Sequence, residues 1–207
     1  TQAQHLLKSD IIDVRVGDYV ASWLTREGAD LKPARRPTSD LKQILGDDRM
    51  RAGLLSAVGT LGDLAKSCAG VALTLPSPRN WIGRCVERNG GDLNDYLDED
   101  TIEMAAMYLA DFVRIFAESG IVAILLEEDA DPGSDAVGLY QPILNVASGY
   151  QWSVALLIAG ELETDPNSGA VDACIAEPKA FASLVADGSA RGVAVPASYW
   201  TDKFSKM

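Results

Sequence analysis

The sequence predicts an α/β protein with a mainly parallel sheet built from repeated strand and helix units. Three continuous apolar runs, 69–75, 121–126 and 152–158, have the length of strands that are buried on both faces. Helical patterns of apolar residues lie between these runs. Because strands that are joined through a helix lie parallel, this order indicates βαβ units. Two architectures fit it: a β/α (TIM-like) barrel or partial barrel, and an open doubly wound sheet.

Residues 1–46 carry a mixed pattern. Residues 10–24 combine a period-two fragment, formed by Ile12, Val14 and Val16, with a helical pattern over 19–24. The prolines and basic residues of 32–37 predict a loop. We expect this N-terminal segment to belong to one α/β domain, residues 1–207, because that length falls in the usual range of a single domain.

The next elements follow a clearer order. A helix is expected over 47–66, where apolar residues recur at spacings of three and four. The apolar run 69–75 follows as a strand and is ended by Pro76 and Pro78. Residues 77–81 are then expected to form a loop at the carboxyl end of this strand.

A long helix is expected to begin at Asp100 or Thr101 and to stop at Ser119–Gly120, because glycine often ends a helix. The strand 121–126 follows it. Turn residues over 129–138 predict a loop, after which we expect a helix at 140–147 and the strand 152–158. Glu177–Pro178 indicates another helix, and 192–196 indicates a fourth strand.

The charge of the chain excludes several classes of partner. It has 30 acidic residues against 18 basic ones and a net charge of −12. We therefore expect neither nucleic acid nor an anionic membrane surface as a partner, because both bind to concentrated basic faces. The sequence has no apolar stretch of membrane-spanning length and no signal-peptide pattern, which predicts a cytoplasmic location.

Few histidines and cysteines are available for chemistry. His5 is the only histidine, which excludes Ser-His-Asp and Cys-His catalysis and a multi-histidine metal site within this chain. Cys68, Cys85 and Cys174 form no Cys-x-x-Cys pair, so no metal site is predicted. Cys85 follows Arg84 and is expected to be the most accessible of the three. The glycine fingerprints of nucleotide-binding loops are absent, and the sequence identifies no cofactor.

The candidate site residues follow the predicted strands, because α/β proteins bind ligands at the carboxyl ends of parallel strands. Ser77 and Arg79 are candidate substrate-binding residues, since a guanidinium grips a carboxylate or phosphate bidentately. Glu127 and Glu128 are candidate catalytic acids or bases. They adjoin Asp129, and adjacent carboxylates that are partly buried should raise the pKa of at least one of them. A solvated acidic strand end is the other interpretation.

Tyr140 and Asn145 are further candidate substrate-binding residues, because aromatic and amide groups near them could line a ligand pocket. Ordinary core packing is the alternative for these side chains. Glu161 and Glu163 follow the third strand, where we favour a solvated strand end.

The run 71–78, the helix ending at 116–120 and the strand 121–126 with its two glutamates resemble one superfamily of β/α barrels. It contains uroporphyrinogen decarboxylase and cobalamin-independent methionine synthase, and the resemblance of pattern covers about residues 50–160. It implies a β/α barrel with a pocket at the strand carboxyl ends. Members of this superfamily decarboxylate porphyrinogens or transfer methyl groups to thiols. The His-x-Cys zinc ligands of the methyltransferases and the arginine-rich N-terminal motif of the decarboxylases have no counterpart here.

Two functions follow from these observations. The first is a small-molecule enzyme that binds an anionic organic substrate through Arg79 and uses Glu127 or Glu128 as acid or base. Its chemistry would be of the lyase/decarboxylase or one-carbon (methyl) transfer type. The second is a non-catalytic or regulatory subunit, or an incomplete barrel that a partner chain or a second copy completes. A full barrel typically needs about 250 residues, and this chain has 207.

Overall fold

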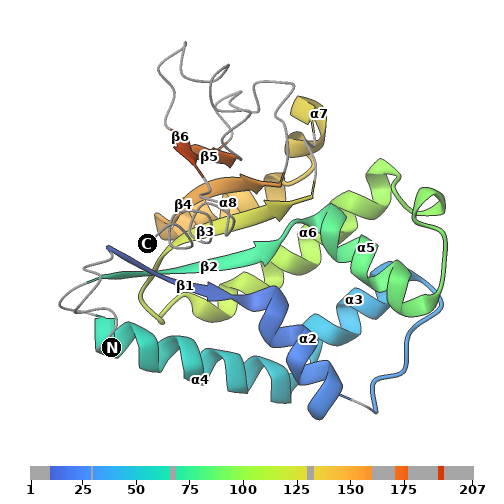
Figure 1. Ribbon diagram of the computed structural model, residues 1–207, viewed down its shortest axis with the longest axis horizontal. Helices are drawn as coiled ribbons and strands as arrows, with labels where there is room; N and C mark the ends of the chain where they lie inside the picture. Colours follow the sequence, from blue (N-terminus) through green and yellow to red (C-terminus); the bar gives the residue numbers. More distant parts are fainter. Residues whose placement is uncertain are drawn as a thin grey trace, which may run out of the picture.

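The computed structural model describes residues 10–28, 30–65, 69–129, 133–159, 171–176 and 191–193. These residues form an α/β fold around a six-stranded sheet (Figure 1). The strands pair in their sequence order, and every pair is parallel. They are β1 (Ile11–Arg15), β2 (Gly70–Pro76), β3 (Ile121–Glu128), β4 (Ser153–Ile158), β5 (Ala173–Ala176) and β6 (Arg191–Val193).

Helices occupy the connections between β1 and β2, between β2 and β3, and between β3 and β4. They are α2 (Val16–Arg26), α3 (Pro37–Gly46), α4 (Asp48–Ala65), α5 (Pro78–Asn89), α6 (Glu99–Val113), α7 (Gly133–Gly138) and α8 (Gln141–Tyr150), with short 3-10 turns η1 (Leu93–Asp95) and η2 (Arg114–Phe116). None of the described helices is both long and apolar enough to cross a membrane.

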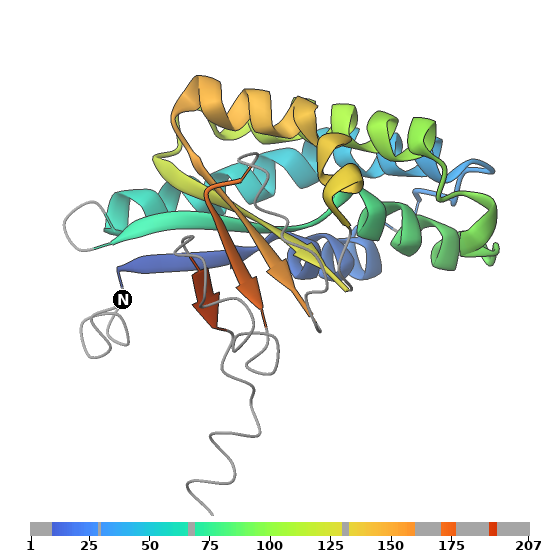
Figure 2. The ribbon, with the colours of Figure 1, turned by 90° about the horizontal axis from the view of Figure 1, so that it is seen from above.

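The two faces of the sheet differ in burial. Along β3, Ile124, Leu126 and Glu128 are buried, whereas the alternating residues Leu125 and Glu127 are only partly covered. Alternation places these two sets on opposite faces. Figure 2 shows α4, α6 and α8 together on one side of the sheet, which is the side of the core. Within the described strands the order never reverses, so this open sheet lacks the switch point at which doubly wound sheets bind ligands.

Most of the expected elements are present. The helix over 47–66 and the strands over 69–75, 121–126 and 152–158 are confirmed as α4, β2, β3 and β4. The long helix expected to run from 100–101 to 119–120 is present as α6, but it ends earlier, at Val113, and is followed by the 3-10 turn η2. Gly120 adopts a positive φ of 75° directly before β3. Residues 140–147 lie almost entirely in α8.

Several local predictions were wrong. Residues 77–81 are not a loop, because α5 begins at Pro78 with Ser77 as its N-cap. Proline and serine favour the start of a helix as much as a loop. For the same reason α3 begins at Pro37, at the end of the expected basic loop. Part of the expected loop at 129–138 forms α7, and β5 has too few residues to stand out as a strand.

Some predictions lie outside the described residues. They concern the helix beginning at 177–178, the end of the strand expected at 192–196, the carboxylates Glu161 and Glu163, and the thiol of Cys68. Cys85 and Cys174 are both buried. The expectation that Cys85 would be the most accessible cysteine was wrong, because it lies on the core side of α5 and is 1% exposed.

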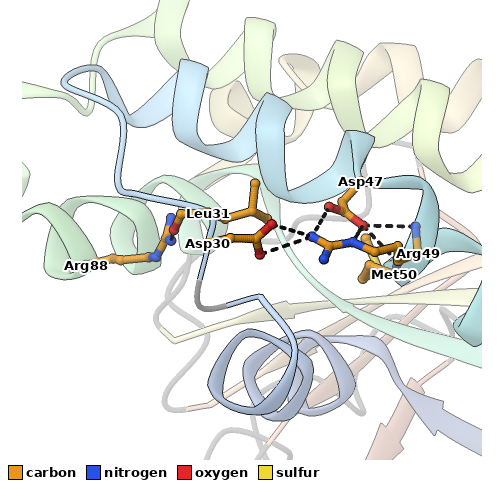
Figure 3. A network of polar contacts seen from close by, with 6 residues as sticks. All are labelled: Asp30, Leu31, Asp47, Arg49, Met50 and Arg88. Carbon is orange, nitrogen blue, oxygen red and sulfur yellow. Dashed lines mark hydrogen bonds and ion pairs between the residues drawn. The ribbon is translucent and has the colours of Figure 1, made fainter.

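Polar side chains connect the N-terminal segment to the rest of the chain. Figure 3 shows Arg49 between Asp30 and Asp47, with which it forms ion pairs at 3.2 and 2.9 Å. The same guanidinium lies over the ring of Trp23 in α2. Arg88 of α5 forms an ion pair with the buried Asp40 of α3 at 2.6 Å. These contacts hold α2 near α4 and α3 near α5.

Candidate functional site

The strands β2, β3 and β4 point their carboxyl ends toward the same edge of the sheet (Figure 1). Two adjoining cavities lie at these strand ends, where α5 begins. Their volumes are about 390 and 320 Å³. Both are lined by Asn80, Arg84, Glu128 and Asp129. The larger one also reaches Arg15 and Glu127, and the smaller one reaches Arg79. We treat the two cavities together as the strand-end site.

The turn between β2 and α5 gives the strand-end site its shape. The Oγ atom of Ser77 caps α5 by accepting a hydrogen bond from the backbone N–H of Asn80 at 3.1 Å. The backbone N–H of Ser77 and the side-chain amide of Asn80 both donate to the carbonyl oxygen of Glu127, each at 2.9 Å. This turn therefore attaches the start of α5 to the end of β3.

Glu127 and Glu128 point to opposite faces of the sheet because they are neighbours on one strand. Glu127 lies on the face away from the helices and accepts a charge-assisted hydrogen bond from Arg15 at the end of β1. Arg15 also pairs with Asp18 at 3.1 Å. The carboxylate of Glu127 is thus paired with a cation, whereas Glu128 forms no ion pair with a described residue.

Glu128 lies on the buried face, and 2% of its surface is exposed. Its Oε1 atom accepts a short hydrogen bond from the hydroxyl of Tyr140. Burial is the main cause that raises the pKa of Glu128, to about 7, and the charge of Asp129 adds a smaller upward effect. Hydrogen bonds from Tyr140 and Ser77 and the charge of Arg79 act in the opposite direction on this pKa.

The sequence-based expectation that one of these glutamates has a raised pKa is thus supported, but its cause is different. Desolvation dominates, and repulsion between neighbouring carboxylates contributes little because alternate side chains lie on opposite faces. A carboxyl group with a pKa near 7 is present in both protonation states at neutral pH. Glu128 can therefore give or take a proton under those conditions.

Tyr140 and Asn145 are not among the residues that line the two cavities. Tyr140 is fully buried behind the site. It contacts the site through the hydrogen bond that its hydroxyl donates to Glu128. Asn145 is exposed on α8, lines neither cavity, and accepts a hydrogen bond from the side chain of Gln141 at 2.8 Å. The structure therefore does not bring Asn145 to the site.

Two arginines give the strand-end site its positive charge. Arg79 lines the smaller cavity, and its charge acts on Glu128. Arg84 lines both cavities, and its guanidinium lies 5.7 Å from the centroid of the Trp81 ring. Among the described residues, neither arginine forms an ion pair of the kind that engages Arg15 and Arg88. Both guanidinium groups are therefore available to an anion.

Sequence reasoning missed Arg84 and Asn80 because it assigned 77–81 to a loop. With the helix start recognised at Ser77–Pro78, these two residues fall four positions apart on one helical face. That spacing could have placed both of them at the strand end.

The described residues contain no group of three or more histidine, cysteine, aspartate or glutamate side chains that is arranged to hold a metal ion. The sequence matches no protein-family model, and no curated protein is significantly similar to it. We therefore infer the function from the residues of the strand-end site.

Proposed function

We propose that this chain is an enzyme in which Glu128 acts as general acid/base on a small anionic organic molecule held by Arg79 and Arg84. One observation carries the proposal: a buried carboxyl group with a pKa of about 7 lines a cavity that two arginines also line. Catalytic acids and bases work best when their pKa lies near the operating pH. Perturbed groups of this kind occur preferentially at functional sites.

Each group has a separate task. A guanidinium can bind a carboxylate through two parallel N–H donors, which sets the orientation of the substrate as well as its affinity. The hydrogen bond from Tyr140 positions the carboxyl group of Glu128. Asn80 and Ser77 hold the surrounding turn, so the proton-transferring group stands on a rigid support.

Of the two reaction types considered for this enzyme, lyase/decarboxylase and one-carbon (methyl) transfer, we favour decarboxylation. In decarboxylation the bond between the carboxyl carbon and its neighbour breaks, and the electron pair stays on that neighbouring carbon while CO2 leaves. A proton must then be added to this carbon. The protonated form of Glu128 supplies such a proton, and a second carboxylate of the substrate would remain bound to the arginines.

The sheet topology supports the wider relation to β/α barrels. Parallel strands in sequence order with helices gathered on one face are the arrangement that such barrels repeat. Within the described residues no pairing joins β6 to β1. That open edge favours the second candidate function, an incomplete barrel that a partner chain or a second copy completes. Light scattering on the purified chain distinguishes a monomer from an assembly.

The test of the enzyme proposal is turnover of di- and tricarboxylic acids in D2O, followed by NMR and by CO2 release. We expect one or more of these acids to lose CO2 and to gain deuterium at the vacated carbon. Glu128→Gln should lower this rate about 10²- to 10⁴-fold, the usual contribution of a general acid. Glu103→Gln removes an exposed carboxylate of α6 and is the matched control, with an unchanged rate.

Arg79→Gln and Arg84→Gln should weaken substrate binding while the fold is kept, because both side chains lie at the rim of a cavity. Full turnover by Glu128→Gln on an identified substrate would contradict the assignment of the acid/base. Full affinity in both arginine variants would contradict the assignment of the anion site.

A further inference from the structure

A third cavity lies beside the strand-end site, between α2 and α5. Its volume is about 470 Å³, within the usual range of small-molecule pockets. Its walls are mainly apolar and include Val20 and Leu24 of α2, Ile44 of α3, and Trp81 and Cys85 of α5. We call it the α2–α5 groove.

The polar groups in the α2–α5 groove are few. Burial raises the pKa of Cys85 to about 12, so its thiol is neutral and behaves as part of the apolar wall. Arg88 is engaged by Asp40 and by the carbonyl oxygen of Leu31. Among the described residues, the buried indole N–H of Trp81 has no hydrogen-bond partner. The groove therefore offers an apolar surface and the guanidinium of Arg84.

Arg84 connects the α2–α5 groove to the strand-end site, because it lines all three cavities. Its position is set by two contacts. The guanidinium lies over the ring of Trp81, and it approaches Gly17 so closely that a Cβ atom there would be 2.7 Å from Nη1. A ligand anion on Arg84 can consequently extend toward Glu128 on one side and into the groove on the other.

We propose that the substrate is an amphipathic carboxylic acid whose apolar tail lies in the α2–α5 groove. Its carboxylate binds Arg84, and its reacting carbon lies on the side of Glu128. The role of this acid as a substrate rests on the proposed function, whereas its binding to the groove does not. Charge complementarity supports this occupant, since one guanidinium without a carboxylate partner among the described residues borders an otherwise apolar groove.

The test is the affinity of a homologous series, butyrate, hexanoate, octanoate and decanoate, for the whole chain by titration calorimetry. Each added methylene should strengthen binding about three- to fourfold until the groove is full, as expected for complete burial of a CH2 group. Octylamine should bind far more weakly than octanoate, because the cation at the groove mouth repels it. The fluorescence of Trp81 should change on binding.

Two matched variants of α2 locate the tail. Ala21 is exposed and lines the groove, so Ala21→Trp should fill it and weaken octanoate binding at least about tenfold while butyrate binding changes little. Ser22 is the next exposed residue on the same helix and is not among the groove residues. Ser22→Trp should leave the whole series unchanged.

The outcomes separate the two proposals. Affinities that do not increase with chain length, or equal octanoate binding by Ala21→Trp and Ser22→Trp, would overturn the groove assignment and leave the enzyme proposal intact. A length-dependent series that is lost in Ala21→Trp supports the groove assignment even if Glu128→Gln keeps full turnover. Equal octanoate affinity in Arg84→Gln and the unmodified chain would overturn the position of the carboxylate.

Discussion

Asp40 and Glu128 are both buried carboxyl groups, with 0% and 2% of their surface exposed, and they serve different purposes. Asp40 accepts hydrogen bonds from Arg88 at 2.6 Å and from the backbone N–H of Ala34 at 3.0 Å. Glu128 accepts one from the hydroxyl of Tyr140 and forms no ion pair with a described residue.

The difference shows how the partner decides what a buried carboxyl group can do. A guanidinium in direct contact compensates the buried charge of Asp40, and the pair fastens the loop before α3 to α5. Hydroxyl donors compensate the charge of Glu128 only in part, so burial still raises its pKa to about 7. The first carboxyl group holds structure together, and the second can exchange a proton near neutral pH.

The largest expected effect comes from breaking the Asp40 pair. Arg88→Met leaves the buried carboxylate of Asp40 without its cation and the carbonyl oxygen of Leu31 without its donor, and should lower the free energy of unfolding by roughly 3–5 kcal/mol. Urea denaturation measures this change. Adding Asp40→Asn should recover part of the loss, because the uncompensated charge is removed. A loss below about 1 kcal/mol in the single variant would mean that the pair contributes little.

The next effect is the pH dependence of stability caused by Glu128. Its pKa is raised on folding, so its stabilising contribution is complete below about pH 4.5 and is lost as pH rises through about 7. The loss amounts to roughly 3 kcal/mol above pH 7. Glu128→Gln should remove this decline and be more stable than the unmodified chain in alkaline solution. Parallel stability curves for the two proteins across this pH range would contradict the prediction.

A smaller effect is expected for the N-cap of α5. Ser77→Ala removes the acceptor for the backbone N–H of Asn80 and should cost about 1 kcal/mol of unfolding free energy. It should also raise the pKa of Glu128 further, because the hydrogen bond from Ser77 lowers that pKa in the folded protein. Thermal unfolding and a pH titration measure the two effects separately. A lowered pKa would argue against the contact.

The smallest effect is expected at Glu127, the neighbour of Glu128 on the opposite face. Its ion pair with Arg15 is partly exposed, since the two side chains retain 18% and 52% of their accessible surface. Glu127→Gln should therefore change the free energy of unfolding by no more than about 1 kcal/mol. The Glu127→Gln variant should also keep the pH dependence of stability that is assigned to Glu128. Loss of that pH dependence in this variant would mean that it belongs to Glu127.

These two glutamates illustrate what the sequence could predict. The apolar runs identified β2, β3 and β4, because strands buried in an α/β core need continuous apolar residues. Alternation along a strand separates Glu127 from Glu128, but it does not tell which of the two faces the helices. That distinction depends on the side chains that cover one face, such as Tyr140, which lies 12 residues further along the chain.

Other misses have local causes. The dipeptide Ser77–Pro78 fits both a loop and a helix start, so Arg84 was not placed at the strand end. Asn145 belongs to a helix whose position was expected, but the exposed side of that helix was not known from its own pattern. β5 is a strand of only four residues, and its pairing with β4 depends on tertiary contacts.

Glu128 exchanges its proton near neutral pH because it is buried without a cation in direct contact. The most direct test is a carbon NMR titration of the glutamate side-chain carboxyl groups, with the Glu128 signal assigned by its absence in Glu128→Gln. The midpoint should lie near pH 7 and should move upward in Tyr140→Phe, because the hydrogen bond from Tyr140 lowers this pKa. A midpoint in the ordinary glutamate range, about 4 to 5, would contradict the conclusion that burial raises the pKa of Glu128.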